Sequence, residues 1–120
     1  MSKKTVVIGA STNTDRYSYK ATVKLKSYGH EVVPVGIKEG EINGLQILTG
    51  MPEVKGVDTV TMYVGPQNQP SYYQYILGLH PKRVLFNPGT ENPEFQSALE
   101  KAGVEVVEGC TLVMLGTGEY

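Results

Sequence analysis

The sequence predicts a doubly wound α/β fold of the Rossmann type, with a parallel five-stranded sheet in a single domain over residues 1–120. The first observation is a set of short apolar and β-branched runs, such as Val6-Val7-Ile8, that show no polar alternation. Such runs are typical of strands buried on both faces of a parallel sheet. The second is their alternation with segments of helical periodicity, which favours right-handed crossovers that cover both faces. A length of 120 residues suits one domain.

The apolar runs place the strands of the sheet. We expect them at residues 4–10, 31–36, 56–64, 83–87 and 104–107. Pro34 falls within the second run and has no N–H to donate to a neighbouring strand. We therefore expect it near a strand end, or at a position where no N–H is needed.

Helical spacing and turn residues place the remaining elements. Tyr17, Ala21 and Leu25 recur at helical intervals before Gly29, which is suited to ending a helix. Prolines at tolerable first-turn positions begin the later helices. We expect the helices at residues 17–28, 69–79 and 93–102. Residues 37–52 are less regular, but Asn43-Gly44 predicts a tight turn within a short hairpin or bent loop. Residues 110–115 form an apolar tail without an assigned element.

Composition gives no support to several classes of protein. Eleven Lys and Arg residues against twelve Asp and Glu residues leave no electrostatic footprint for nucleic acid or an anionic membrane. No segment approaches the roughly 18 apolar residues of a membrane span. The single cysteine, Cys110, cannot form a disulfide framework, and with two distant histidines it gives no metal-ligand spacing. We expect a cytoplasmic protein without a metal site, a nucleic-acid partner or a membrane partner.

The stretch over residues 5–16 predicts an anion site. Gly9 turns the chain after the first strand without a Cβ in the way, and residues 11–15 supply helix-capping side chains. A strand, a tight turn of small residues and a helix N-terminus place free backbone N–H groups around one point. This geometry suits a phosphate group.

The carboxyl ends of the strands supply further candidate ligand-binding residues, because a ligand lies there in a doubly wound sheet, where the strand order reverses. Glycine at these ends would let the backbone approach a ligand closely, although glycine and proline are also ordinary turn residues. The candidates are Gly9, Ala10 and Ser11 after the first strand, Gly36 and Lys38 after the second, Gly65 and Pro66 after the third, and Asn87, Pro88 and Gly89 after the fourth.

The candidate residues narrow the nucleotide class. The G-x-G-x-x-G dinucleotide fingerprint is absent, because Ser11 and Thr14 replace its second and third glycines. The second strand is followed by Lys38 instead of a carboxylate, and a cation there suits an extra phosphate on the ribose. NADP and coenzyme A (CoA) both carry such a phosphate. Arg16, at the helix start, could clamp the pyrophosphate.

These motifs resemble the small single-domain CoA-binding proteins, which are similar to the N-terminal CoA-binding domain of the succinyl-CoA ligase alpha subunit. The matching motifs are Gly9-Ala10-Ser11, Arg16-x-Ser18, Leu25, Gly29-His30-Glu31-Val32-Val33-Pro34-Val35, Gly44 and Val57-Asp58-Thr59-Val60. The resemblance implies roles for sets of residues. Gly9, Ala10, Ser11, Thr12 and Asn13 would hold the phosphates, Lys38 would meet the 3′-phosphate, and the Val64-Gly65-Pro66 and Phe86-Asn87-Pro88 strand ends would cradle the adenosine and pantetheine.

No catalytic constellation is found in the sequence. His30 and His80 have no sequence-local nucleophile or orienting carboxylate. Cys110 is interpreted as a small buried hydrophobe, or as a thiol that forms a mixed disulfide if it lies near the CoA thiol. The preferred hypothesis is a non-catalytic carrier, sensor or partner module for CoA or acyl-CoA, acting as a homodimer or with a partner enzyme subunit. The alternative is a small NADP-dependent reductase or nucleotide-handling enzyme.

Overall fold

The computed structural model describes residues 2–120 and has a five-stranded sheet with the strand order β2-β1-β5-β6-β7. Every neighbouring pair in this sheet is parallel. The strands are β1 (Thr5–Ile8), β2 (Val32–Val35), β5 (Thr59–Met62), β6 (Arg83–Phe86) and β7 (Glu105–Glu108). This arrangement confirms the predicted fold class. The strand order reverses between β1 and β5, since the chain runs outward from β1 to β2 and then in the opposite direction from β5 to β7.

A separate antiparallel hairpin joins β2 to β5 and consists of β3 (Gly40–Ile42) and β4 (Leu45–Ile47). Its two turn residues, Asn43 and Gly44, have φ angles of +48° and +84°. A two-residue turn with both φ angles positive matches the twist of a hairpin, which is why Asn-Gly is favoured there. The hairpin alternative for this stretch is therefore confirmed.

Four α-helices connect or follow the strands, and two differ from expectation. They are α1 (Tyr17–Ser27), α2 (Tyr73–Gly78), α3 (Pro93–Lys101) and α4 (Thr111–Thr117). The helix predicted at 69–79 begins late, because the 3₁₀ turns η1 (Pro66–Asn68) and η2 (Pro70–Tyr72) replace its first part. Pro66 and Pro70 each begin a turn, since a proline lacks the N–H that a continuous helix would need. The apolar tail, to which no element was assigned, forms α4.

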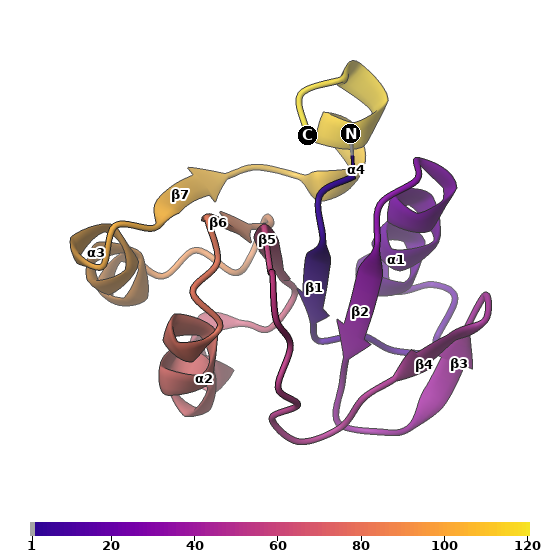
Figure 1. The fold of residues 1–120 in the computed structure, drawn as a ribbon, viewed down its shortest axis with the longest axis horizontal. Coiled ribbons are helices and arrows are strands. Elements are labelled where there is room, and N and C mark those ends of the chain that lie inside the picture. Colours follow the sequence, from indigo (N-terminus) through magenta and orange to yellow (C-terminus); the bar gives the residue numbers. More distant parts are fainter. Residues whose placement is uncertain (1) are drawn as a thin grey trace.

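The helices cover the two faces of the sheet in pairs (Figure 1). Val6 and Ile8 of β1 pack in one cluster with Ile76 of α2 and with residues of α3, whereas Val7 packs in the other with Leu25 of α1. Leu115 of α4 and Ile42 and Ile47 of the hairpin join this second cluster. Successive strand residues point to opposite faces, so a strand buried on both faces has to be apolar throughout.

The two edges of the sheet differ in how they are covered. On the outer side of β2, the Leu48 amide donates to the Pro34 carbonyl at 2.9 Å, so the side of Pro34 that lacks an N–H faces away from β1. This confirms that Pro34 occupies a position where no N–H is needed. At the other edge, β7 begins and ends with the exposed residues Glu105 and Glu108.

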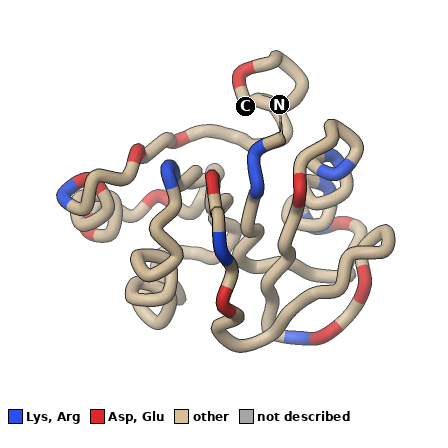
Figure 2. The backbone as a smooth tube through the Cα atoms, viewed as in Figure 1, with Lys and Arg blue, Asp and Glu red and all other residues tan. Residues whose placement is uncertain are grey.

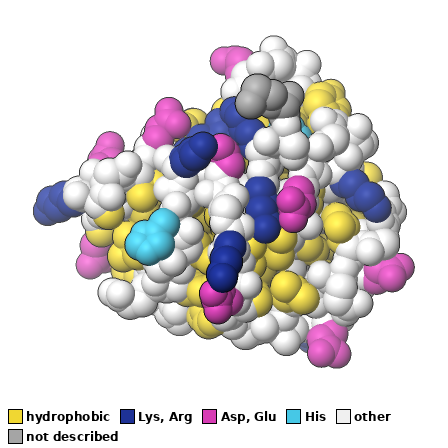
Figure 3. All heavy atoms as spheres, viewed as in Figure 1, with side chains coloured by type: hydrophobic (Ala, Val, Ile, Leu, Met, Phe, Trp, Pro, Cys, Tyr) yellow, Lys and Arg dark blue, Asp and Glu magenta, His cyan; other side chains and the backbone are white. Residues whose placement is uncertain are grey.

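The two ends of the described chain lie side by side (Figure 1). The Lys3 ammonium donates to the Tyr120 carbonyl, and the Thr5 and Tyr120 hydroxyls share a hydrogen bond of 2.5 Å. Along the backbone and over the face shown, acidic and basic side chains are interspersed and neither sign forms a continuous field (Figures 2 and 3). Within residues 2–120, no helix is long and apolar enough to cross a bilayer.

Candidate functional site

A groove of about 890 Å³ lies at the carboxyl edge of the sheet, where the strand order reverses. Three segments line it: the β1–α1 loop, the residues after β2 and the chain after β5. Its lining residues are Gly9, Ala10, Ser11, Thr12, Arg16, Ile37, Lys38, Glu39, Tyr63, Val64, Gly65, Gln67, Asn68, Pro70, Ser71 and Tyr72. Its volume falls within the roughly 300–1,000 Å³ of small-molecule sites, and its position follows the rule for doubly wound sheets.

The β1–α1 loop presents backbone N–H groups to the groove. The Gly9 and Ala10 amides donate to the Val35 carbonyl at 3.0 and 2.9 Å, which holds the start of the loop against β2. Within residues 2–120, the amide of Thr12 has no hydrogen-bond acceptor. The N-cap residue of α1 is Arg16, and its side chain makes no capping hydrogen bond. The first-turn amides of this eleven-residue helix are not capped by that side chain, but residues 17–19 do not line the groove, so the loop amides are the ones placed to bind an anion there.

Two cations and one anion flank these amides. Arg16 and Lys38 line the groove from the β1–α1 loop and from the loop after β2, and both side chains are exposed. Glu39 lines it beside Lys38. Two positive groups beside the unpaired amide of the β1–α1 loop favour a ligand with several negative charges.

Tyr63 contributes an apolar floor to the groove. Its ring belongs to the cluster on the α1 and α4 face, and its hydroxyl is buried without a hydrogen-bond partner in the described part of the chain, although the Thr61 and Thr111 hydroxyls lie near. Burial raises the pKa of the Tyr63 phenol well above its ordinary value. Tyr63 therefore stays neutral and offers the ligand a surface, not a charge.

Glycines at the strand ends let loops pack on one another. A Cβ on Gly36 would lie 2.4 Å from the Ala10 carbonyl oxygen, and one on Gly9 would lie 3.1 Å from the Tyr63 backbone. Gly89 has a φ angle of +91°, with nothing within 4 Å of where a Cβ would stand. At Gly9 and Gly36 the close approach is between segments of this chain, so these glycines shape the groove from behind.

The structure brings half of the predicted ligand-binding residues to the groove. The residues found there are Gly9, Ala10, Ser11, Thr12, Arg16, Lys38, Val64 and Gly65. Those outside its lining are Asn13, Ser18, Gly36, Pro66, Phe86, Asn87, Pro88 and Gly89.

The end of β6 has a different surrounding from the one expected. Phe86 is fully buried in the core beside Phe95, at 6.1 Å between ring centroids. The Asn87 amide is 2 % exposed and donates to the Thr61 hydroxyl and the Met62 carbonyl, while its oxygen accepts from the Thr111 amide and hydroxyl. The hydrogen bonds of the Asn87 side chain join the end of β6 to β5 and α4 and leave it no free donor or acceptor. Neither Phe86 nor Asn87 is therefore free to face a ligand.

Groove residues that the sequence did not suggest come mainly from the chain after β5. Gln67, Asn68, Pro70, Ser71 and Tyr72 line one side, which we call the 64–72 wall because it continues from Val64. The repeated prolines at 66 and 70 were the available signal, since they break a helix and leave short turns.

The reactive groups considered in the sequence do not meet at this groove. His30 lies toward the amino edge, where its Nδ1 accepts from the Lys3 amide at 2.9 Å. Cys110 is half-buried and is not among the lining residues. Within residues 2–120, no group of three or more His, Cys, Asp and Glu side chains could hold a metal ion.

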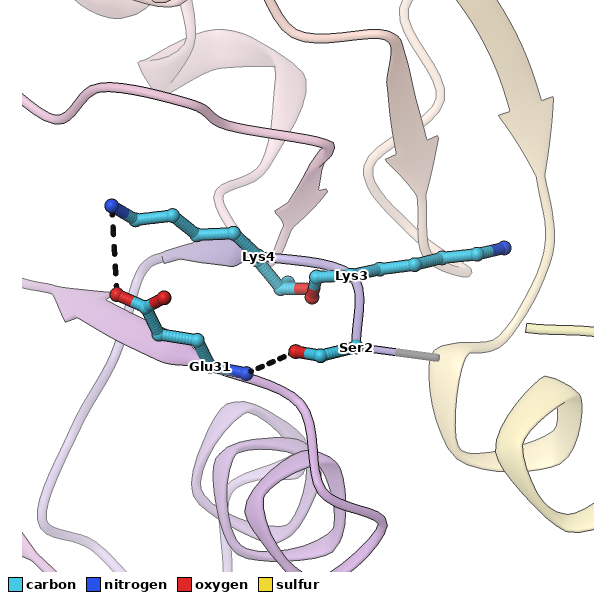
Figure 4. Close-up of polar contacts among 5 residues, drawn as sticks. Ser2, Lys3, Lys4 and Glu31 are labelled. Carbon is cyan, nitrogen blue, oxygen red and sulfur yellow. Dashed lines mark hydrogen bonds and ion pairs between the residues drawn. The ribbon is translucent and has the colours of Figure 1, made fainter.

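A second hollow, of about 1030 Å³, lies at the opposite edge, at the amino ends of the strands. There the Lys4 ammonium pairs with the Glu31 carboxylate at 3.5 Å, and the Glu31 amide donates to the Ser2 hydroxyl (Figure 4). Acidic and basic lining residues are equally represented, with Glu31, Glu53 and Asp58 against Lys4, Lys55 and Lys82. It is larger than the carboxyl-edge groove, but it lies away from the crossover point and its charges offset one another. The carboxyl-edge groove is the better candidate for an anionic ligand.

Fold and groove together define a doubly wound α/β domain of the nucleotide-binding type. The chain belongs to the CoA binding domain family, whose model matches residues 3–116. The resemblance inferred from the sequence motifs is thereby confirmed.

Several relatives match this chain over most of their length. A crystal structure of an uncharacterized protein is 55 % identical with a TM-score of 0.98, covering 100 % of this chain and 99 % of that one. A conserved hypothetical protein from Pyrococcus furiosus is 33 % identical with a TM-score of 0.77, covering 88 % of this chain and 92 % of that one. The uncharacterized protein YneT of Bacillus subtilis (strain 168) is 24 % identical over 107 residues, covering 88 % of this chain and 79 % of that protein.

Proposed function

We propose that this protein binds CoA or an acyl-CoA in the carboxyl-edge groove, as a non-catalytic carrier, sensor or partner module. The observation that carries the proposal is the joint position of the unpaired Thr12 amide, Arg16 and Lys38 around one groove at the crossover point. CoA supplies a pyrophosphate and a 3′-phosphate, and the groove offers amides for the first and a separate cation for the second. Family membership supports the same ligand class.

The assignment of parts follows from the groove. The pyrophosphate would lie on the amides of Ser11 and Thr12 with Arg16 as a clamp, and the 3′-phosphate would lie at Lys38. The 64–72 wall and Tyr63 would flank the adenosine or the pantetheine. No lining residue forms a nucleophile–base pair with another by any hydrogen bond in residues 2–120, which favours binding over catalysis.

The test uses isothermal titration calorimetry with CoA and dephospho-CoA on wild type, Lys38→Ala and a matched control, Lys101→Ala. Lys101 is exposed at the end of α3 and outside the groove. An exposed lysine–phosphate contact contributes about 1 kcal/mol, so Lys38→Ala should weaken CoA about fivefold. Dephospho-CoA should lose much less affinity, and Lys101→Ala should change neither constant.

Two results would contradict the proposal. An equal loss for both ligands in Lys38→Ala would separate Lys38 from the 3′-phosphate. NADP binding by the wild type without CoA binding would replace the proposal with the alternative of an NADP-dependent enzyme, since Lys38 suits the 2′-phosphate of NADP as well.

A further inference from the structure

We propose that Gln69 is a positioning residue for the ligand, and that its buried amide fixes the 64–72 wall of the groove from behind. The inference rests on the proposed function for its ligand and on the hydrogen bonds of one side chain for its geometry. Gln69 itself does not line the groove, whereas its sequence neighbours Asn68 and Pro70 do.

The Gln69 side chain is completely buried, and its amide group makes three hydrogen bonds. Nε2 donates to the Val64 carbonyl at 2.9 Å and to the Thr90 carbonyl at 2.7 Å. Oε1 accepts from the side-chain Nδ2 of Asn92 at 3.0 Å. Val64 is the first residue of the wall, while Thr90 and Asn92 belong to the turn between β6 and α3. One amide thus joins the wall to the neighbouring strand connection.

The far end of this network is itself anchored. The Asn92 Nδ2 group also donates to the Tyr73 hydroxyl at 2.8 Å, and its oxygen caps α3 by accepting from the Phe95 amide. The Tyr73 ring stacks on Phe95 with 4.2 Å between ring centroids. Gln69 therefore holds the wall to a point fixed by both a helix cap and an aromatic stack.

The wall has little regular structure of its own to hold it. It consists of two consecutive 3₁₀ turns, closed by the amides of Asn68, Gln69 and Tyr72 bonding to carbonyls three residues back. Such turns are short and have poorer hydrogen-bond geometry than an α-helix. The wall is exposed on the groove side at Gln67, Asn68, Pro70 and Ser71. Its position therefore depends on the buried side, where Gln69 lies.

If Gln69 positions the wall, removing its amide should weaken ligand binding as well as lower stability. Without the Gln69 amide, the wall would sample several positions, and only a fraction would accept the ligand. The apparent affinity is the intrinsic affinity multiplied by that fraction. If the wall is correctly placed about one tenth of the time, Kd rises about tenfold. A buried glutamine that served stability alone would lower the melting temperature and leave Kd unchanged.

The main test compares Gln69→Met with Thr111→Val. Methionine keeps the length and approximate volume of glutamine but removes all three hydrogen bonds. Thr111 is a matched control, because it is equally buried at the same edge of the sheet and bonds to Thr61 and Asn87, but it does not touch the wall. The measurements are melting temperature, Kd for CoA by calorimetry, and amide hydrogen exchange over residues 64–72 without ligand.

We expect both variants to melt at lower temperature, but only Gln69→Met to raise Kd about tenfold and to speed exchange over residues 64–72. Should Gln69→Met fail to fold, Asn92→Asp replaces it, because aspartate retains the acceptor that caps α3 and lacks the donors to Gln69 and Tyr73. The same direction of change is expected there, with a smaller rise in Kd.

Unchanged Kd in a folded Gln69→Met protein, or an equal rise in Thr111→Val, would overturn the positioning role. If the wild type binds no CoA, the proposed function fails by itself. The exchange measurement then still decides about Gln69: unchanged exchange over residues 64–72 would overturn the role, and faster exchange would support it.

Discussion

Replacing Gly36 with alanine tests how the loops behind the groove are packed. A Cβ on Gly36 would stand 2.4 Å from the Ala10 carbonyl oxygen, whereas ordinary contact begins at 3.4 Å. The obstacle is backbone, and the neighbouring amides of Gly9 and Ala10 are both bonded to Val35, so the loop cannot move away freely. Relieving the overlap requires a shift of about 1 Å in the β1–α1 loop, at a cost of about 1–3 kcal/mol.

The same substitution at Gly78 is the matched control. Gly78 lies in α2, where a Cβ would have nothing within 4 Å of it. Alanine is favoured over glycine in a helix by about 0.5–1 kcal/mol, so Gly78→Ala should be stabilising by that amount.

Thermal unfolding followed by circular dichroism gives the readout for both variants. At about 4 °C per kcal/mol for a chain of this size, Gly36→Ala should lower Tm by about 4–12 °C and Gly78→Ala should raise it by about 2–4 °C. Gly36→Ala should also weaken CoA, because the displaced loop carries the anion-binding amides. A Gly36→Ala protein as stable as the wild type would show that the loops are not packed as described.

Two further predictions concern stability. Burial lowers the pKa of His30, as does the positive charge of Lys3, so the folded state disfavours the protonated ring and stability should fall as pH drops below about 6.5 toward the lowered value. His30→Asn should remove this part of the acid sensitivity in Tm measurements from pH 8 to 5, and an unchanged pH profile would contradict the assignment. Asn87→Leu should cost about 2–4 kcal/mol in urea unfolding, because Thr61 and Thr111 lose partners in a buried network. A loss below about 0.5 kcal/mol would mean that the network repairs itself.

Much of the fold follows from local sequence. β-branched runs such as Val6-Val7-Ile8 favour strands buried on both faces, and Asn43-Gly44 favours one hairpin turn. The helix α4 was missed because residues 111–117 are short and carry no capping side chain, as Cys110 makes no cap hydrogen bond. That helix is held by packing against α1 and the sheet through Leu115, which periodicity over seven residues does not reveal.

The candidate site likewise has a part that local sequence predicts and a part that it does not. The β1–α1 loop and Lys38 could be predicted, because a strand, a glycine turn and a helix start impose their own geometry. Apart from Val64 and Gly65, the 64–72 wall could not, since its position depends on the Gln69 side chain reaching Thr90, twenty-one residues away. Phe86 and Asn87 stand at a strand end as expected, but burial against α3 and α4 decides which way they point.

The treatment of the two sheet edges bears on how this protein can associate. At one side Leu48 is already hydrogen-bonded to the outer edge of β2. At the other side β7 presents a carboxylate at each of its ends. An additional strand from another chain would meet a filled position or two negative charges, and both discourage edge-to-edge growth. A partner would therefore attach more readily to the helices or to the groove loops than by extending the sheet.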